Sequence, residues 1–171
     1  MAGAKPKTQP PFDFAQGRLR ARVSQRTPSP GKLRAIRLGP RFLRAFQFAA
    51  EKHAGQARKA STIPYIAHLM GVTSLVLEAG GDEDMAIAAL LHDVVEDCGG
   101  APMLMEVQRR FGKRVAHIVD GCTDADTVPK PPWRERKENY LQHLKTADAD
   151  TRLVSAGGQA EQCTFHSHRL S

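Results

Sequence analysis

The hydrophobic positions of the chain follow a helical period from residue 40 onward. Apolar side chains recur every three or four residues from Phe42 to Ala50, and this run stops at Gly55. A second run begins after Pro64, a residue that suits a first helical turn, and it stops at Gly80. The spacing therefore predicts two amphipathic helices joined by a short polar loop.

A third run, from Met85 to Val95, is apolar nearly all round. Asp82 precedes this run and is a favourable N-cap residue, and Gly99 ends it. A helix without a polar face is typical of the centre of a fold. The spacing predicts that this helix is buried on all sides.

Further helices are expected downstream, separated by a proline-rich loop. The helices cover Pro102–Arg110, Lys113–Val119 (stopped by Gly121), Trp133–Thr146 and a segment that Asp148 opens, and the loop covers Asp124–Pro132. No segment shows the period of two that is typical of a strand. The pattern predicts an all-α fold, a helical bundle.

The positive charge of the chain is confined to its N-terminal part. The net charge is +7, yet residues 1–40 hold nine Lys or Arg against one acidic residue, together with six of the eleven prolines. Such a segment buries too little apolar surface to offset its ordering entropy, so residues 1–38 are expected to be disordered. A basic arm could contact nucleic acid or anionic lipid. This arm lacks interleaved aromatic residues and an amphipathic face, so we expect a solvated tail and no nucleic-acid partner.

The remaining composition indicates a cytoplasmic protein without a membrane partner. No stretch approaches the roughly 20 apolar residues of a membrane span, and the first thirty residues contain no hydrophobic signal core. Cys98, Cys122 and Cys163 are odd in number and lack C-x-x-C spacing, which argues against a disulfide framework and a zinc knuckle. We expect all three to be reduced.

Polar side chains interrupt the central apolar run at His92, Asp93, Glu96 and Asp97. Spacings of three and four place several of them on one helical flank, where burial without partners would cost several kcal/mol. A divalent cation such as Mn²⁺, Fe²⁺ or Zn²⁺ would be a suitable partner. His68 stands in the second apolar run in the same way. A shared metal site, a satisfied core histidine and a surface ion pair all remain open on the pattern alone.

The loop between the first two helices carries two adjacent cations, Arg58 and Lys59. An arginine can stack on a base or pair with a phosphate through two hydrogen bonds, and a lysine supplies a point charge. The loop is therefore either a clamp for an anionic ligand or an ordinary solvated loop.

These motifs together resemble the HD domain of the RelA/SpoT-type and small alarmone hydrolases. The resemblance covers about 120 residues in order. It rests on His53-Ala-Gly-Gln-Ala-Arg58-Lys59, Pro64-Tyr65-Ile66-Ala67-His68, Ala89-Leu90-Leu91-His92-Asp93-Val94-Val95-Glu96-Asp97, Phe111-Gly112 and Val119-Asp120-Gly121-Cys122-Thr123. Its order makes it far more specific than any single motif.

The resemblance implies a (p)ppGpp 3′-pyrophosphohydrolase of the stringent response that uses Mn²⁺. It implies that His68, His92 and Asp93 bind the metal. It also implies that Glu96 and Asp97 position or deprotonate the attacking water.

The same resemblance implies a second group of residues that bind the nucleotide. Arg58, Lys59 and Ser61 would contact the guanine end, and Thr123 would line the pocket. His53 lies outside the ligand set of this family, and we interpret it as structural.

Two departures from the family pattern stand out. Leu69 replaces a proline, which is tolerable because the neighbouring histidine is kept. After Val154 the family continues with an Ala-Asp-Lys-Leu-x-Asn-x-Arg helix, whose Asp is the fourth metal ligand and whose Asn contacts the nucleotide. This chain reads Ser-Ala-Gly157-Gly158-Gln-Ala-Glu-Gln-Cys163 instead, without helical periodicity.

The standard genetic code permits the missing helix when the codons are read from the second base of Gly157. We therefore interpret 157–171 as a non-family tail translated out of frame, and 39–156 as an HD phosphohydrolase domain without its C-terminal helices. Exposed apolar faces and impaired hydrolysis would follow. The alternatives are a genuine divergent terminus, an HD phosphohydrolase for another nucleotide, and a nucleotide-binding module without catalysis.

Overall fold

The computed structural model describes residues 12–13, 18–19, 35–123 and 132–169. The chain divides into two units, Met1–Ala35 and Ile36–Ser171. In the first unit, β1 (Phe12–Asp13) pairs with β2 (Arg18–Leu19) in antiparallel register. Most of the arm expected to be disordered, and all of the proline-rich loop except Pro132, lie outside the described residues.

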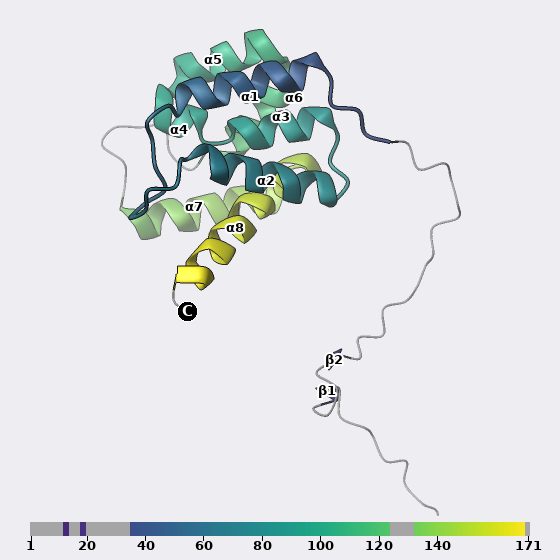
Figure 1. Cartoon of the computed structure of the whole chain (residues 1–171), viewed down its shortest axis with the longest axis vertical. Coiled ribbons are helices and arrows are strands. Elements are labelled where there is room, and N and C mark those ends of the chain that lie inside the picture. The colour runs from purple at the N-terminus through teal and green to yellow at the C-terminus, as the bar shows by residue number, and fades with distance from the viewer. Residues whose placement is uncertain (1–11, 14–17, 20–34, 124–131, 170–171) are drawn as a thin grey trace, which may run out of the picture. The chain divides into compact units, whose positions relative to one another are not determined.

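The second unit is built of helices, with an isolated antiparallel bridge between Ala57 and Pro64, which confirms the predicted all-α class (Figure 1). Its helices are α1 (Pro40–Lys52), α2 (Ile66–Glu78), α3 (Glu83–Leu91), α4 (Val94–Cys98), α5 (Gly100–Phe111), α6 (Lys113–Cys122), α7 (Trp133–Thr146) and α8 (Ala149–Arg169). Hydrophobic periodicity alone located most of these helices to within a few residues.

Helix α3 is the centre of the second unit, as its apolar circumference predicted. Seven of its nine residues are buried, and it packs against α1, α2, α6 and α8. Asp82 caps it, because the carboxylate accepts a hydrogen bond from the amide of Met85 at 3.1 Å. The expected continuity to Val95 is wrong: α3 ends at Leu91 and α4 begins at Val94, so His92 and Asp93 occupy a turn between two helices.

Helix α8 corrects the expectation of a tail without helical order. It continues to Arg169, and Asp148 opens it by accepting the amide proton of Thr151 at 2.9 Å. Gly157 and Gly158 are buried within it. A Cβ atom at Gly157 would lie 3.2 Å from Val76 Cγ2, so the helix packs closely on α2. Residues 157–169 therefore form part of the helix that packs on α2, while the absence of further family helices stays a prediction.

The expectation that Gly121 stops a helix is also wrong, because α6 continues through it to Cys122. A Cβ atom at Gly121 would lie 2.6 Å from Thr151 Cγ2. The absent side chain therefore permits the close approach of α6 to α8.

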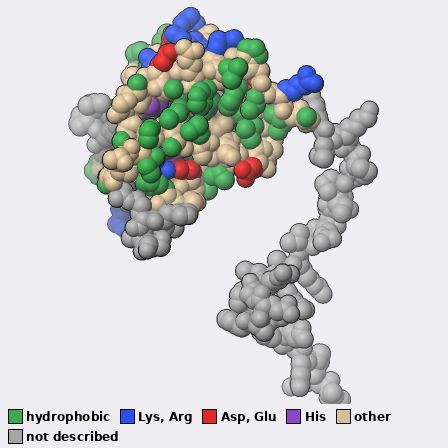
Figure 2. Space-filling model, in the orientation of Figure 1, with side chains coloured by type: hydrophobic (Ala, Val, Ile, Leu, Met, Phe, Trp, Pro, Cys, Tyr) green, Lys and Arg blue, Asp and Glu red, His purple; other side chains and the backbone are tan. Residues whose placement is uncertain are grey.

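The face in Figure 2 carries hydrophobic side chains over α1, α2 and α3, with many Lys and Arg side chains toward its edges. Leu43 in α1 and Met70 in α2 are among the exposed large apolar residues. Among the described residues, no helix is long and apolar enough to cross a membrane.

Candidate metal centre

Three side chains that the sequence singled out as metal ligands meet at one point of the bundle. His68 comes from α2, and His92 and Asp93 come from the turn between α3 and α4. Their ligand atoms all lie within 4.8 Å of one another. Asp93 Oδ2 is 3.2 Å from His92 Nε2 and 3.5 Å from His68 Nε2. The interruption of the central helix thus gives Asp93 a position facing both imidazole rings.

Each histidine has its second ring nitrogen held by a fixed acceptor. His92 Nδ1 donates to the carbonyl oxygen of Ala89 at 2.8 Å, and His68 Nδ1 donates to the carboxylate of Glu161. Such partners select the tautomer that leaves Nε2 free for a cation. Both Nε2 atoms consequently face the same point next to Asp93.

The environment of His68 fits a cation on physical grounds. Its Nε2 atom is buried and has no hydrogen-bond partner among the described residues, and Asp93 Oδ2 lies opposite. A lone pair that faces a carboxylate oxygen is unfavourable unless a proton or a cation lies between them. Two imidazoles and a carboxylate also form a donor set that suits first-row divalent metals. The residues present therefore fit the divalent cation that the resemblance implies.

The pKa values of the cluster also favour a positive charge between the carboxylates and the imidazole rings. Burial lowers the pKa of His68, but the carboxylates of Asp93 and Glu161 raise it more, so that it lies above 6.5. Burial raises the pKa of Asp93, yet the two histidine rings and the hydroxyl of Tyr65 outweigh burial and hold it well below 3.8. Asp93 is therefore an ionised carboxylate at neutral pH.

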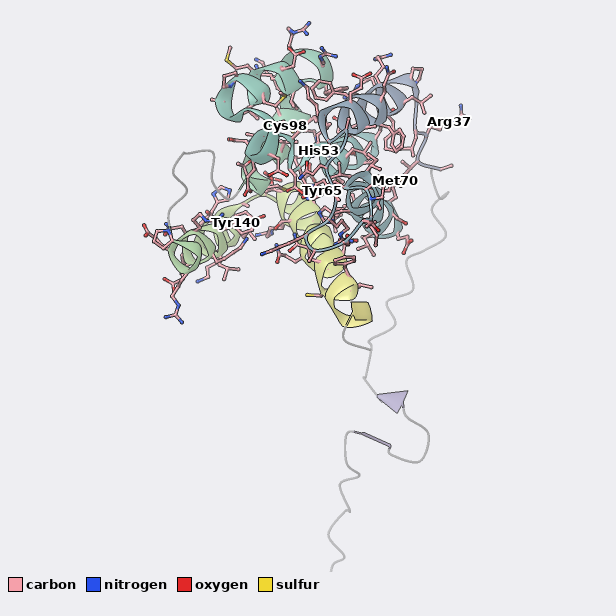
Figure 3. All side chains as sticks on the ribbon, turned by 60° about the vertical axis from the view of Figure 1, so that its left-hand side comes forward. Arg37, His53, Tyr65, Met70, Cys98 and Tyr140 are labelled. Carbon is pink, nitrogen blue, oxygen red and sulfur yellow. The ribbon has the colours of Figure 1, made fainter. Side chains whose placement is uncertain are left out.

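Tyr65 supports the cluster and was not identified from the sequence. Its hydroxyl donates a 2.5 Å hydrogen bond to Asp93 Oδ2. Its ring stacks on His53 with the ring centroids 5.0 Å apart, and Figure 3 labels both side chains. His53 in turn shares a 2.7 Å hydrogen bond with Gln56. These contacts support a structural role for His53.

Arg58 lies at the cluster but already has an anionic partner. Its guanidinium forms two parallel bonds to Glu161, with Nη1–Oε1 2.5 Å and Nη2–Oε2 2.8 Å. The two side chains are only 9% and 14% exposed, and Arg58 also lies over the ring of Phe165 at 3.6 Å from its centroid. Both partners of Arg58 lie on the part of α8 that was not expected to be helical.

The other expected nucleotide contacts have different settings. Lys59 is exposed, whereas Ser61 binds the loop itself: its hydroxyl donates to the carbonyl oxygen of Arg58 at 2.9 Å. Thr123 ends α6, and its hydroxyl donates to the carbonyl oxygen of Val119 at 3.0 Å. Ser61 therefore shapes the loop that presents Arg58.

Glu96 and Asp97 lie on α4, and neither belongs to the group of ligand atoms described above. Glu96 Oε1 is 3.9 Å from Arg136 Nη1 of α7. Asp97 Oδ2 accepts a 3.0 Å hydrogen bond from Gln56 Nε2. Both carboxylates thus have partners from outside their own helix.

Gly158 marks a position where the site has no side chain. In the alternative reading frame the Asp of Ala-Asp-Lys-Leu falls at this position. A Cβ atom there would lie 3.7 Å from His92 Nε2, which is an ordinary contact distance. A carboxylate at position 158 would therefore reach the cluster, whereas glycine adds nothing to its three donors among the described residues.

An all-helical bundle with an adjacent His-Asp pair and a histidine from a second helix around one point defines an HD-type domain. The profile of the family described as "HD domain" matches residues 45–155. The chain belongs to this family, and the observed arrangement of the three side chains agrees with a divalent metal as its cofactor.

Named relatives are similar to this chain over the same region. Guanosine-3′,5′-bis(diphosphate) 3′-pyrophosphohydrolase MESH1 of Xenopus tropicalis is 41% identical over 116 residues, which are 66% of this chain and 62% of the relative. Guanosine-3′,5′-bis(diphosphate) 3′-pyrophosphohydrolase of Aquifex aeolicus is 39% identical over 111 residues, 65% of this chain and 15% of the relative. The chain thus spans less than two thirds of either relative.

A solved structure shares the fold. It is described as "A metazoan ortholog of SpoT hydrolyzes ppGpp and plays a role in starvation responses". The TM-score is 0.66 at 29% sequence identity, and the match covers 75% of this chain and 71% of that one. This likeness agrees with the predicted HD-type helical bundle.

Proposed function

We propose that this chain is a metal-dependent phosphohydrolase of the (p)ppGpp 3′-pyrophosphohydrolase type, converting ppGpp to GDP and pyrophosphate with Mn²⁺. The observation that carries the proposal is the convergence of His68 Nε2, His92 Nε2 and Asp93 Oδ2, with the first of these atoms buried and unpartnered within the described residues. The names of the relatives support the substrate.

His68, His92 and Asp93 would hold the cation through these three atoms. A divalent cation in this position would supply activation of water and stabilisation of negative charge on the reacting phosphate. Tyr65 keeps Asp93 Oδ2 in place, and the Ala89 carbonyl keeps the ring of His92 in place. The preorganised donors would hold the site in one geometry before substrate arrives.

Glu96 and Asp97 are proposed to orient the attacking water and to accept its proton. Both residues lie on α4, which begins directly after Asp93. Attack at phosphorus breaks the bond to the 3′ oxygen, and the departing oxygen takes up a proton. Arg58 and Lys59 would bind the nucleotide, Ser61 would shape their loop, and Thr123 would line the pocket.

The test is pyrophosphate release from ppGpp by the purified full chain with Mn²⁺, with EDTA as the metal-free control. The Asp93→Asn variant should remove the activity, because a neutral amide weakens the metal site while conserving size. Pyrophosphate release by the wild-type chain in EDTA, or by the Asp93→Asn variant with Mn²⁺, would contradict the proposed centre. Turnover of another nucleotide, with ppGpp left intact in a matched panel, would reject the substrate and favour the wider HD phosphohydrolase class.

A nucleotide-binding module with little catalysis is a second candidate. One observation favours it: Gly158 adds no metal donor to the three described residues of the cluster. This candidate predicts that ppGpp binds in equilibrium dialysis without being hydrolysed, and that Arg58→Ala abolishes the binding. Hydrolysis at a rate that follows bound nucleotide would rule it out.

A further inference from the structure

Glu161 connects the candidate metal centre to α8, and no motif or family residue accounts for it. Its Oε2 atom accepts the proton of His68 Nδ1 and also binds Arg58 Nη2, while Oε1 binds Arg58 Nη1. Its side chain is 14% exposed, and that of His68 is 2% exposed. This carboxylate is therefore sequestered from solvent together with the ring that it contacts.

The contact fixes which nitrogen of His68 faces the centre. Glu161 can only accept at Nδ1, because an ionised carboxylate has no proton to donate. A neutral imidazole that donates through Nδ1 carries its lone pair on Nε2. Nε2 is the atom that lies 3.5 Å from Asp93 Oδ2 and has no hydrogen-bond partner among the described residues.

The second bond of the carboxylate keeps Glu161 itself in place. The paired bonds to Arg58 restrict both oxygens, so the acceptor for His68 Nδ1 has one available orientation. His92 is fixed by a backbone carbonyl oxygen, which needs no further support. The two histidines thus reach the same orientation by different means, and only that of His68 depends on a side chain of α8.

We propose that Glu161 is a positioning residue for the metal centre: it selects the Nδ1-protonated form of His68 and thereby presents Nε2 to a divalent cation. This inference rests on the proposed metal site and extends it to a residue that does not contact the cation. Outer-sphere carboxylates of this kind typically contribute about 10–100-fold to metal affinity.

The test is Mn²⁺ binding to the metal-free full chain, measured by isothermal titration calorimetry. Glu161→Ala should weaken Mn²⁺ binding by about tenfold or more. Glu161→Gln keeps an oxygen that can accept from Nδ1, so it should recover part of the loss. Glu78→Gln is the matched control, because Glu78 lies on the same helix as His68 and accepts a hydrogen bond from the exposed Ser74. The Mn²⁺ affinity of this variant should equal that of the wild type.

A variant at Arg58 separates positioning from anchoring of the loop. Arg58→Met removes the ion pair but leaves the Glu161 carboxylate next to Nδ1, so Mn²⁺ binding should fall much less than in Glu161→Ala. Equal losses in the two variants would overturn the proposal, because the effect would then come from the ion pair. Wild-type affinity in Glu161→Ala would overturn it as well.

A measurement on the wild-type chain decides the matter if the Glu161 variants do not fold. Long-range ¹H–¹⁵N NMR at alkaline pH, where the ring is neutral, should find the His68 proton on Nδ1. A proton on Nε2 would overturn the inference. Mn²⁺ binding without ppGpp hydrolysis would reject the proposed reaction and leave the role of Glu161 intact. Unchanged Mn²⁺ affinity in Glu161→Ala would reject the role of Glu161 and leave the proposed reaction intact.

Discussion

Substitution of Gly158 by aspartate should complete the metal centre. Gly158 lies on α8, and a Cβ atom would sit 3.7 Å from His92 Nε2 and 4.0 Å from its Cδ2. Both distances are ordinary van der Waals contacts, so the side chain enters without displacing the ring. The neighbouring Gly157 differs, because its Cβ atom would lie 3.2 Å from Val76 Cγ2. Position 158 is therefore the favourable site for an added ligand.

Gly158→Asp should lower the stability of the metal-free chain and increase the stabilisation that Mn²⁺ gives. Without a cation, a second carboxylate beside Asp93 is a buried like charge, and the free energy of unfolding should fall by about 2 kcal/mol. With Mn²⁺, an additional anionic ligand should tighten binding by about tenfold, or about 1.4 kcal/mol. At saturating Mn²⁺ that gain adds to the stabilisation by bound metal and raises Tm by about 5 °C more than in the wild type.

The assay is thermal unfolding followed by circular dichroism, with and without Mn²⁺, supported by calorimetric titration of the metal. Gly158→Asn is the matched control: it has the same size and shape but no charge, so it should lose less stability without metal and gain less from Mn²⁺. If Gly158→Asp and Gly158→Asn respond equally to Mn²⁺, position 158 does not face the metal, and the expectation of a fourth ligand at this position is wrong.

Three further outcomes follow from the same contacts. Tyr65→Phe removes the 2.5 Å bond to the Asp93 carboxylate and should lower the free energy of unfolding by about 1.5–3 kcal/mol in urea titrations of the metal-free chain. Asp148→Ala removes the cap of α8 and should cost about 1 kcal/mol, whereas Asp148→Asn should retain most of the stability. The pKa of His68 is raised above 6.5, so its protonation stabilises the metal-free fold fully below pH 6.5, and this contribution is lost as pH rises through the raised value. Urea titrations across this range should therefore show the loss, and saturating Mn²⁺ should abolish it because the bound form of His68 has a deprotonated Nε2.

Hydrophobic spacing predicted the bundle well because most of its helices bury one regular apolar stripe. Helix α7 was expected over Trp133–Thr146 and has these bounds. The pattern failed at His92 and Asp93, where both neighbouring segments are apolar and only a local turn separates α3 from α4. Such a turn leaves no trace in hydropathy, since the residues on either side remain buried.

The continuation of α8 beyond Ala156 escaped prediction because small residues form much of its buried face. Gly157 and Gly158 are buried, yet glycine contributes almost nothing to a hydrophobic period and is unfavourable in a helix interior. The close packing on α2 that glycine permits supplies the stability that helix propensity does not. Whether residues 157–171 arise from a shifted reading frame stays a hypothesis, which the nucleotide sequence across these codons would decide.

The sequence predicted which side chains would gather at the candidate site, but not the contacts that support them. The family resemblance singled out His68, His92 and Asp93, and their ligand atoms do lie within 4.8 Å of one another; their role as metal ligands stays a prediction. Tyr65 was quoted within a motif, but its bond to Asp93 depends on the distance between two helices, and no sequence spacing encodes that distance. Glu161 lies 93 residues after His68, in a segment without family resemblance, so no signal pointed to it.

If His68 and Arg58 have the roles proposed above, metal binding and nucleotide binding both depend on the Glu161 carboxylate, which contacts both side chains. Arg58 can bind a phosphate only when its paired bonds to Glu161 are broken or shared, and both groups are largely buried. When a nucleotide binds Arg58, Glu161 therefore keeps only its hydrogen bond to His68. A variant without this carboxylate loses both contacts: Arg58 no longer has its ion pair, and His68 Nδ1 no longer has its acceptor. The same substitution should thus strengthen the contact to nucleotide and weaken the contact to metal. If α8 belongs to the site, loss of Glu161 should change the affinities for metal and for nucleotide in opposite directions. If α8 only covered the core, the substitution should change both affinities in the same direction.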